Sequence, residues 1–339
     1  MPKRLIPGTI ALGAFTFTMT ALPGSPAIQN AIPMPYFGTT PFAAPGLGLV
    51  GGVIMLGIGL WWLQWRAGRA AKADEGYGQT DVPGKPDTAG ANEDVAANHQ
   101  PNTGQPGSFA LALAPVVAVI ALNYWLSSHG LTRIDASYLA EPRFGATTLE
   151  AVRGMCAVLS ALALAILLLL ALQWRRLPGL KKTLETGASS SVMPLLNTAS
   201  QVGFGAVIAS LAGFALIRDA VLDIAPGNPL VSLAVSVNLL AGITGSASGG
   251  MTIALQTLGE AWLAMGQAAG ISPELLHRVT AIATGGLDAL LHNGAVITLL
   301  SICGLTHRQS YVDILMVAVL GPIAALVAVI LLGTWFGSF

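Results

Sequence analysis

The sequence predicts an all-α integral membrane protein with about seven transmembrane spans and one re-entrant hairpin. Of its 339 residues, 53% are hydrophobic and only 9% are charged, whereas a soluble domain carries roughly 25% charged residues. Uncharged runs long enough to cross a bilayer recur along the chain. A third observation is an uncharged stretch of 36 residues between Asp223 and Glu260, with a glycine- and serine-rich cluster at 244–250 in its middle.

The length of this uncharged stretch predicts the hairpin. One straight helix of that length would extend about 54 Å, far beyond the roughly 30 Å of bilayer hydrocarbon. If the cluster divides it, each arm has about 15 residues and a length of roughly 22 Å, too short to cross. We therefore expect a hairpin over residues 229–257 that reaches mid-membrane and returns. Irregular backbone at that depth must be buried in protein or line a wet cavity.

The other uncharged runs predict the domain organisation. Residues 1–65 form a first unit with a broken helix at 5–33 and a closing span at 43–65. Residues 66–108 are rich in Gly, Pro, Asp, Asn and Gln, which predicts a flexible cytoplasmic loop. The second unit, 109–339, contains spans at 109–128, 154–174 and 192–217, the hairpin at 229–257, a broken helix at 279–306 and a closing span at 312–336.

Basic residues near the span ends predict the orientation. Alternating the predicted spans places 11 Lys and Arg residues on the side of the N-terminus and 5 on the opposite side. Since cytoplasmic loops carry the excess of Lys and Arg, we expect a multi-pass protein of the cell inner membrane. Its N-terminus is then cytoplasmic and its C-terminus periplasmic, and the hairpin enters from the outer face.

Two spans contain helix-breaking sequence near their middle. In the first, the break is Ala21-Leu22-Pro23-Gly24-Ser25-Pro26; in the sixth, Gly285-Gly286-Leu287-Asp288 leads into His292-Asn293-Gly294. By the span count these two discontinuous helices run in opposite directions, which is typical of inverted repeats with a substrate site between them. Because the first unit lacks counterparts of several spans of the second, the repeat is incomplete.

The breaks and the hairpin tip supply the candidate binding residues. Half-helix N-termini attract an anion, glycines let the backbone approach it, and hydroxyls add hydrogen bonds. Turn chemistry and polar contacts between helices are the alternatives. The candidates for substrate binding are Thr244, Gly245, Ser246, Ser248, Gly249 and Gly250 at the tip, Ser25 in the first break with Gln29 and Asn30 just beyond it, and His292 and Asn293 at the second break. Asn197, Thr198, Ser200 and Gln201 either line the same cavity or cap a helix.

Asp288 and His292 are the candidates for proton coupling, because ionisable residues within a membrane usually mark a pathway or relay. They lie four residues apart and would share one face if the segment between them were helical. The alternative is a buried pair that only fastens the break. Glu260, His277 and Arg278 flank the hairpin and the sixth span, where we expect interfacial anchors.

Several functional classes are disfavoured by composition. The net charge of +0 gives no reason to expect nucleic acid as a partner. Cys156 and Cys303 lie in apolar segments, and the five histidines show no metal-ligand spacing. We expect no metal and no cofactor. No Ser or Cys nucleophile is placed with a base, which argues against an enzyme.

Three runs are similar to the gluconate permease family (GntP-type), which belongs to a wider group of anion transporters built from inverted repeats. They are NTASQVGFGAVIAS (197–210), LAGITGSASGGMTIAL (240–255) and GGLDALLHNGAVITLLSICGLTHRQSYVDI (285–314), and FTMTALPGSPAIQNAIP (15–33) resembles the family's first broken helix. The resemblance implies proton-coupled import of a small carboxylate such as gluconate or a related hydroxy acid. It also implies a site around Ser246, Ser248 and residues 288–293, and a homodimer.

The chain departs from the resemblance in length, because family members extend further at the N-terminus. This favours an N-terminally shortened chain that lacks the scaffold spans and hairpin of its first repeat. We therefore expect a proton symporter with a small carboxylate, protons and the lipid bilayer as partners. The alternatives are a non-transporting truncated permease or assembly remnant, and a sodium-coupled anion carrier or channel.

Overall fold

The fold was examined in a computed structural model that describes residues 2–76, 109–144, 146–173, 179–213, 216, 220 and 228–339. The described chain is helical and contains no β-strand, which confirms the all-α prediction. Three of its helices are long and apolar enough to cross a membrane: Pro45–Lys72, Val152–Leu172 and His307–Phe336. The count of seven spans remains a prediction.

The N-terminal part is a series of short helices followed by a long one. A 3-10 turn, η1 (Lys3–Leu5), precedes the four short helices α1 (Ile6–Ala14), α2 (Phe17–Thr20), α3 (Ile28–Ala31) and α4 (Met34–Phe37). The chain is therefore interrupted at residues 15–16, 21–27 and 32–33, and the longest interruption lies where the Pro- and Gly-rich break was predicted. The long helix α5 (Pro45–Lys72) begins with a proline at its first position, where the missing N–H costs nothing.

Helix α5 ends seven residues beyond the predicted span, so residues 66–72 are not loop. The Ala- and Arg-rich sequence there favours a helix, and its basic residues lie near the helix C-terminus, where the dipole favours positive charge. Arg69 stacks over the Trp65 ring at 4.9 Å. Residues 77–108, the remainder of the predicted loop, lie outside the described part of the chain.

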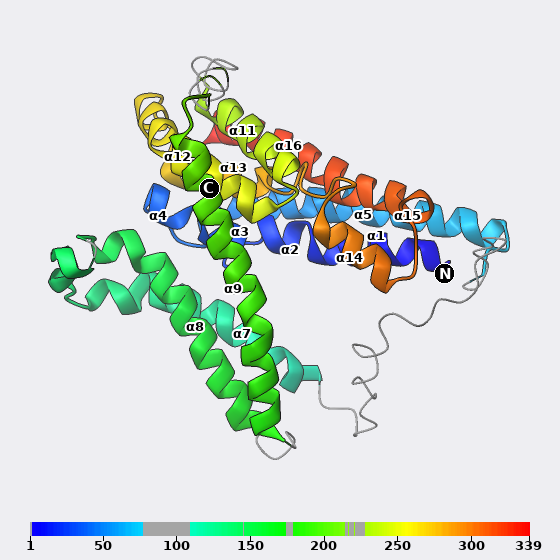
Figure 1. The fold of residues 1–339 in the computed structure, drawn as a ribbon, viewed down its shortest axis with the longest axis horizontal. Coiled ribbons are helices and arrows are strands. Elements are labelled where there is room, and N and C mark those ends of the chain that lie inside the picture. Colours follow the sequence, from blue (N-terminus) through cyan, green and yellow to red (C-terminus); the bar gives the residue numbers. More distant parts are fainter. Residues whose placement is uncertain are drawn as a thin grey trace.

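The middle of the chain forms an arm of three helices (Figure 1). It comprises α7 (Phe109–Trp125) with the π-turn η2 (Leu126–Gly130), the short 3-10 turns η3 (Leu131–Arg133), η4 (Ser137–Ala140) and η5 (Pro142–Phe144), and then α8 (Leu149–Gln173) and α9 (Leu180–Ser210). Helix α8 packs on α4, and α9 packs on the second hairpin arm. Helix α9 begins 12 residues before the predicted span, because the polar segment from Leu180 also forms helix.

The C-terminal part contains the hairpin and the second broken helix. Its elements are α11 (Pro229–Thr244), α12 (Ala247–Ala268), α13 (Pro273–Ala283), α14 (Gly294–Ile302), α15 (His307–Leu315), the π-turn η7 (Met316–Leu320) and α16 (Gly321–Phe336). Helices α15, η7 and α16 form one rod, which lies beside α5 in Figure 1. The main core lies between α5, α11, α12, α13 and α16, with Trp262 as its largest fully buried apolar side chain.

Contacts between distant segments define two opposite ends of this body. At one end, Ser310 donates to the Arg4 carbonyl at 2.6 Å and Arg66 donates to Asp313 at 2.9 Å, which joins the chain start to the end of α5 and to α15. At the other end, the Gly46 N–H donates to the Phe339 carbonyl at 2.7 Å. Residues 228, 269–272, 275, 333–334 and 337–338 line one pocket there. Both outer ends of the α11–α12 hairpin therefore lie beside the C-terminus.

This placement gives the two broken helices opposite directions. The series α1–α4 runs from the first end toward the second, whereas α13–α14 runs from the second end back to the first (Figure 1). The hairpin enters from the second end and turns at residues 245–246, inside the body. Its depth in a bilayer remains a prediction.

We predict that the Arg4–Glu75 pair stabilises the first end only above acidic pH. The Nε and Nη2 atoms of Arg4 donate to the two carboxylate oxygens of Glu75, at 2.6 and 2.8 Å. These bonds lower the pKa of Glu75 from its ordinary 4.5. A lowered carboxyl pKa adds stability above about pH 4.5 that is lost as the pH falls through the folded-state value. Glu75→Gln should therefore cost about 0.5 kcal/mol near neutrality and progressively less as the pH falls below 4.5, measured by thermal unfolding in detergent. Glu141→Gln, in an exposed ion pair with Arg143, is the control and should change stability less.

Candidate functional site

The hairpin tip is a tight turn held by its own residues. Gly245 has a positive φ of 61°, and the Ser246 side chain accepts from the Gly249 N–H at 3.2 Å and so caps α12. Thr244 is used within the turn, since its hydroxyl lies 2.7 Å from the Leu240 carbonyl. The chain therefore reverses at this cluster, while a hairpin that re-enters a membrane stays a prediction. The second arm, α12, begins at Ala247 and continues to Ala268, beyond the predicted end at 257.

The segment between α13 and α14 is not helical from Thr284 to Asn293. Asn293 fastens it: its side-chain oxygen accepts from Ala295 N–H at 2.6 Å, and its amide donates to the Gly245 carbonyl at 2.8 Å and to the Asp288 carbonyl. One side chain thus caps α14 and joins the break to the hairpin tip. Because its amide is satisfied within the chain, Asn293 serves mainly to shape the site.

The hairpin tip, the second break and the first broken helix enclose one cavity of about 510 Å³. This volume lies within the range typical of small-molecule sites, roughly 300–1,000 Å³. Five of the predicted binding residues line it together with the predicted coupling residue. The lining comprises Phe15, Met19, Gln29, Gly245, Ser246, Ala247, Ser248, Asp288, Ala289, Asn293, Gly294, Ala295, Val296 and Thr298.

Asp288 is the only acid among the lining residues. It is 6% exposed, and its Oδ1 atom is buried without a hydrogen-bond partner in the structure. Backbone N–H groups of Asp288 and Ala289 lie beside the carboxylate, but no cation of the described chain pairs with it, so its ionised form is costly in such surroundings. Protonation would remove that cost, which makes Asp288 the group of the cavity best placed to take up a proton.

Gln29 lies on the wall formed by the first broken helix. Its side chain is 7% exposed, lines the cavity and makes no hydrogen bond to another described residue. An amide can both donate and accept, so Gln29 is available to a polar ligand. Phe15 and Met19 add apolar surface to the same wall.

Two helices begin at this cavity. The first residues of α12, Ala247 and Ser248, and the first residues of α14, Gly294 and Ala295, all line it. Helix N-termini present N–H groups and a partial positive charge, which favours an anion. The cavity therefore combines two anion-attracting helix ends with one unpaired acid.

Asp288 and His292 do not share a helix face, because the chain between them lacks helical geometry. His292 is exposed and does not line the cavity; its Nε2 atom donates to the Gly242 carbonyl at 2.8 Å. In the described structure no hydrogen bond or ion pair joins the two side chains. The shared helix face, which we expected only for a helical segment, is therefore absent, and so is the alternative of a buried Asp–His pair. His292 fastens the break to α11, and a role of either residue in proton coupling stays a prediction.

Other predicted residues hold the fold around the cavity. Ser25 donates to the Thr18 carbonyl at 2.9 Å, and Asn30 donates to Pro41 at 2.8 Å. Gly250 packs against the α11 backbone at Ala241. None of these, nor Thr244 or Gly249, lines the cavity. In α9, Ser200 is exposed and also outside the lining, while the side chains of Asn197, Thr198 and Gln201 lie outside the described structure.

His277 and Arg278 are not interfacial anchors, since both side chains are 0% exposed. They lie in α13, whose first turn is capped by Ser272. His277 contacts Thr39 and Asn30, and Arg278 is bonded to backbone carbonyls of the first broken helix. Because both residues stand at the start of a predicted span, we expected them at the membrane surface. The sequence alone does not distinguish that position from a buried one.

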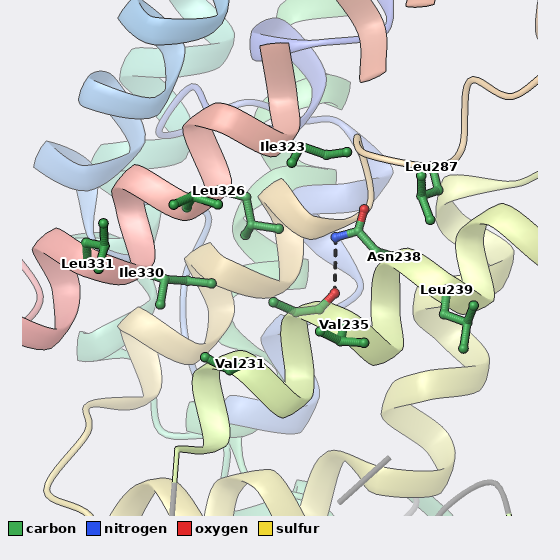
Figure 2. Close-up of a pocket in the computed structure, with 11 residues that line it drawn as sticks. Val231, Val235, Asn238, Leu239, Leu287, Ile323, Leu326, Ile330 and Leu331 are labelled. Atoms are coloured by element: carbon green, nitrogen blue, oxygen red, sulfur yellow. Dashed lines mark hydrogen bonds between the residues drawn. The ribbon is translucent and has the colours of Figure 1, made fainter. Parts of the chain in front are cut away.

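A second cavity of about 520 Å³ lies between α11 and α16 (Figure 2). It is lined by aliphatic side chains and Asn238, whose amide donates to the Ala234 carbonyl at 3.1 Å. Leu287 lines this groove, whereas its neighbour Asp288 lines the polar cavity. The break thus turns consecutive side chains toward different cavities, and only the polar one suits an anion.

A comparison with known proteins identifies the family. The chain is 43% identical over 335 residues to a protein of Bacillus subtilis (strain 168) named uncharacterized transporter YxjC, and the match covers 97% of this chain and 70% of that relative. The chain belongs to this transporter family. No protein-family model and no solved structure matches it. The family supports a role in transport and, with the apolar helices, a place in a membrane.

Proposed function

We propose that the protein is a secondary active transporter that carries a small organic carboxylate across the inner membrane by proton symport. The observation that carries this proposal is the cavity in which the N-termini of α12 and α14 meet the unpaired Asp288. The transporter family and the opposite directions of the broken helices are consistent with it. We place the N-terminus in the cytoplasm and the C-terminus in the periplasm.

Charge repulsion supplies a reason for the coupling. A substrate carboxylate at the helix N-termini would lie in the same small cavity as Asp288. Two carboxylates that share a site cannot both stay ionised without a large cost. Protonation of Asp288 removes the repulsion, so binding of the anion and of a proton favour each other.

The substrate class follows from the neutral polar groups. Gln29, Ser246, Ser248 and Thr298 line the cavity beside the anion-attracting helix ends. Side-chain amides and hydroxyls recognise hydroxyl groups of a ligand by hydrogen bonds. We therefore propose gluconate or a related hydroxy acid, which the resemblance to gluconate permeases also favours.

Uptake into proteoliposomes tests this function. Labelled gluconate should accumulate when the lumen is more alkaline than the medium, and a protonophore should abolish the accumulation. Replacing sodium by choline should have no effect. Uptake that requires sodium and ignores the pH gradient would favour a sodium-coupled carrier, for which the unpaired Asp288 oxygen and nearby carbonyls provide ligands. No uptake of gluconate or other hydroxy acids under any gradient would contradict the proposal.

We predict that Ser248→Leu blocks binding by filling the cavity from the hairpin tip. Ser248 lines the cavity, with its hydroxyl 3.5 Å from that of Ser246. The larger apolar side chain removes space and polar groups together, so the half-saturating substrate concentration should rise about tenfold or more. Ser301→Leu is the matched control, because Ser301 is exposed on α14 and outside the lining. Equal affinities for both variants would place the substrate elsewhere.

A further inference from the structure

Arg278 is a fully buried cation without an acidic partner. Its side chain is 0% exposed and makes hydrogen bonds only to neutral acceptors. Among the described residues, no Asp or Glu forms an ion pair with it. These acceptors are the carbonyls of Thr20, Ala21, Pro41 and Ala43 and the side-chain oxygen of Asn30.

The guanidinium bonds to the first broken helix, which forms one wall of the polar cavity. Two of its acceptors, Thr20 and Asn30, are the chain neighbours of Met19 and Gln29, which line that cavity. Backbone carbonyls orient the guanidinium but do not cancel its charge. The positive charge therefore acts on the cavity through a low-permittivity core, where electrostatic interactions are strong.

His277 adds no charge beside Arg278. Its Nε2 atom lies 3.2 Å from the Asn30 side-chain oxygen, which can only accept, so Nε2 carries the proton. Its Nδ1 atom, 2.6 Å from the Thr39 hydroxyl, then accepts from that hydroxyl. The Asn30 orientation is fixed, because its amide donates to the carbonyls of Ser25 and Pro41. A doubly protonated ring could make the same two contacts, but full burial next to the Arg278 cation disfavours a second positive charge and favours the neutral imidazole.

The other ionisable groups around α13 and the break are remote, exposed or neutral. Helices α3, α11, α14 and α16 carry none. Glu260 of α12 is exposed, and Arg66 of α5 pairs with Asp313 at the first end. Glu274 of α13 is exposed, and Arg153 of α8 precedes Gly154, where that helix packs on α4. The remaining groups are Arg69 and Lys72 at the end of α5, Tyr36 and Tyr311, and His292 and His307, which bond to backbone carbonyls. Of all these groups, Asp288 lines the cavity, and Arg278 bonds to residues next to its lining.

We propose that Arg278 is a fixed counter-charge that is balanced in turn by Asp288 and by the substrate. In the empty carrier, ionised Asp288 balances Arg278. When the anion binds, its carboxylate takes over that role and Asp288 accepts one proton, so the core stays neutral in both states. This inference rests on the proposed function and deepens it, since it fixes one proton per monovalent acid.

Arg278 is a positioning residue, because it does not touch the substrate. It acts through the electrostatic field of its positive charge and through its hydrogen bonds to the first broken helix, which forms one wall of the cavity. For a monovalent acid, the balance makes each cycle electroneutral: one negative charge and one proton cross together. An imposed membrane potential should then leave wild-type uptake unchanged, while a pH gradient drives it.

Neutralising Arg278 tests the proposal in proteoliposomes with labelled gluconate. In Arg278→Gln, no positive charge balances the bound anion, and Asp288 stays protonated in the empty carrier. Affinity should fall by about tenfold or more, the effect expected of one unit charge in a core of low permittivity. The dependence of affinity on pH, which in the wild type follows Asp288, should also disappear. Arg278→Lys keeps the charge and should retain that pH dependence even if its affinity is reduced.

Controls separate this outcome from misfolding and from failure of the proposed function. Arg308→Gln removes an exposed arginine and should behave as wild type. Each variant's thermal unfolding, followed by tryptophan fluorescence, shows whether it is folded. Two results would overturn the counter-charge proposal. One is a folded Arg278→Gln variant whose affinity and pH dependence match those of the wild type, and the other is wild-type uptake driven by the membrane potential. If the wild type itself shows no proton-driven uptake, the proposed function fails instead.

Discussion

Asp288→Asn is expected to abolish net proton-driven uptake while exchange of substrate across the membrane persists. An asparagine neither takes up nor releases a proton, yet it leaves space for the anion, which still balances Arg278. The loaded carrier can therefore reorient in both directions. The empty carrier would hold Arg278 without any counter-charge, because the residues around it offer only neutral acceptors.

The size of the effect follows from that uncompensated charge. A buried charge left without a counter-charge costs about 3–5 kcal/mol. The empty carrier of this variant should therefore be populated more than about a hundredfold less, and net uptake, which requires that state, should fall accordingly. Two measurements check this: labelled gluconate entry driven by a pH gradient, and its entry into vesicles preloaded with unlabelled gluconate. Asp135→Asn, at an exposed position, is the matched control. Normal proton-driven accumulation by Asp288→Asn would remove Asp288 from the coupling role.

The breaks in the helices were predictable because their causes are local. Proline removes a backbone donor and glycine accepts a positive φ, so the interruptions near residues 21–27 and at 284–293 follow from composition. The hairpin tip was predictable for the same reason, together with the length limit on its arms. Opposite directions of the two broken helices then followed from counting spans. These features position the cavity.

The roles of individual polar residues were harder to predict, because they depend on contacts between distant segments. Asn30 was a candidate ligand, but it is used by His277 and Arg278, which lie about 250 residues further along the chain. Arg278 was missed because burial of a cation depends on which carbonyls the folded chain brings to it. The helix ends were misplaced where polar sequence continued the helix, as in α5 and α9. Charge marks the end of an apolar run, which need not be the end of a helix.

Gly250→Ala is expected to destabilise the hairpin more than a single added methyl group usually would. A Cβ at position 250 would overlap backbone atoms of Leu240 and Ala241 in α11. A side chain in the way can rotate, but these atoms move only if α11 and α12 separate along their contact. Gly242 of α11 packs closely against Leu287, which lies in the second break. A displacement of α11 would therefore also disturb the break and the cavity.

The loss in unfolding free energy should therefore lie at the upper end of overpacking effects, about 3 kcal/mol, and substrate binding should weaken with it. Denaturant unfolding in detergent micelles gives the first quantity, and gluconate affinity the second. Gly57→Ala in α5 provides the comparison, since a Cβ there meets nothing within 4 Å and alanine favours a helix by up to about 1 kcal/mol. If Gly250→Ala were as stable as Gly57→Ala, the two hairpin arms would not be in backbone contact, and the tip that forms the cavity would have to be placed differently.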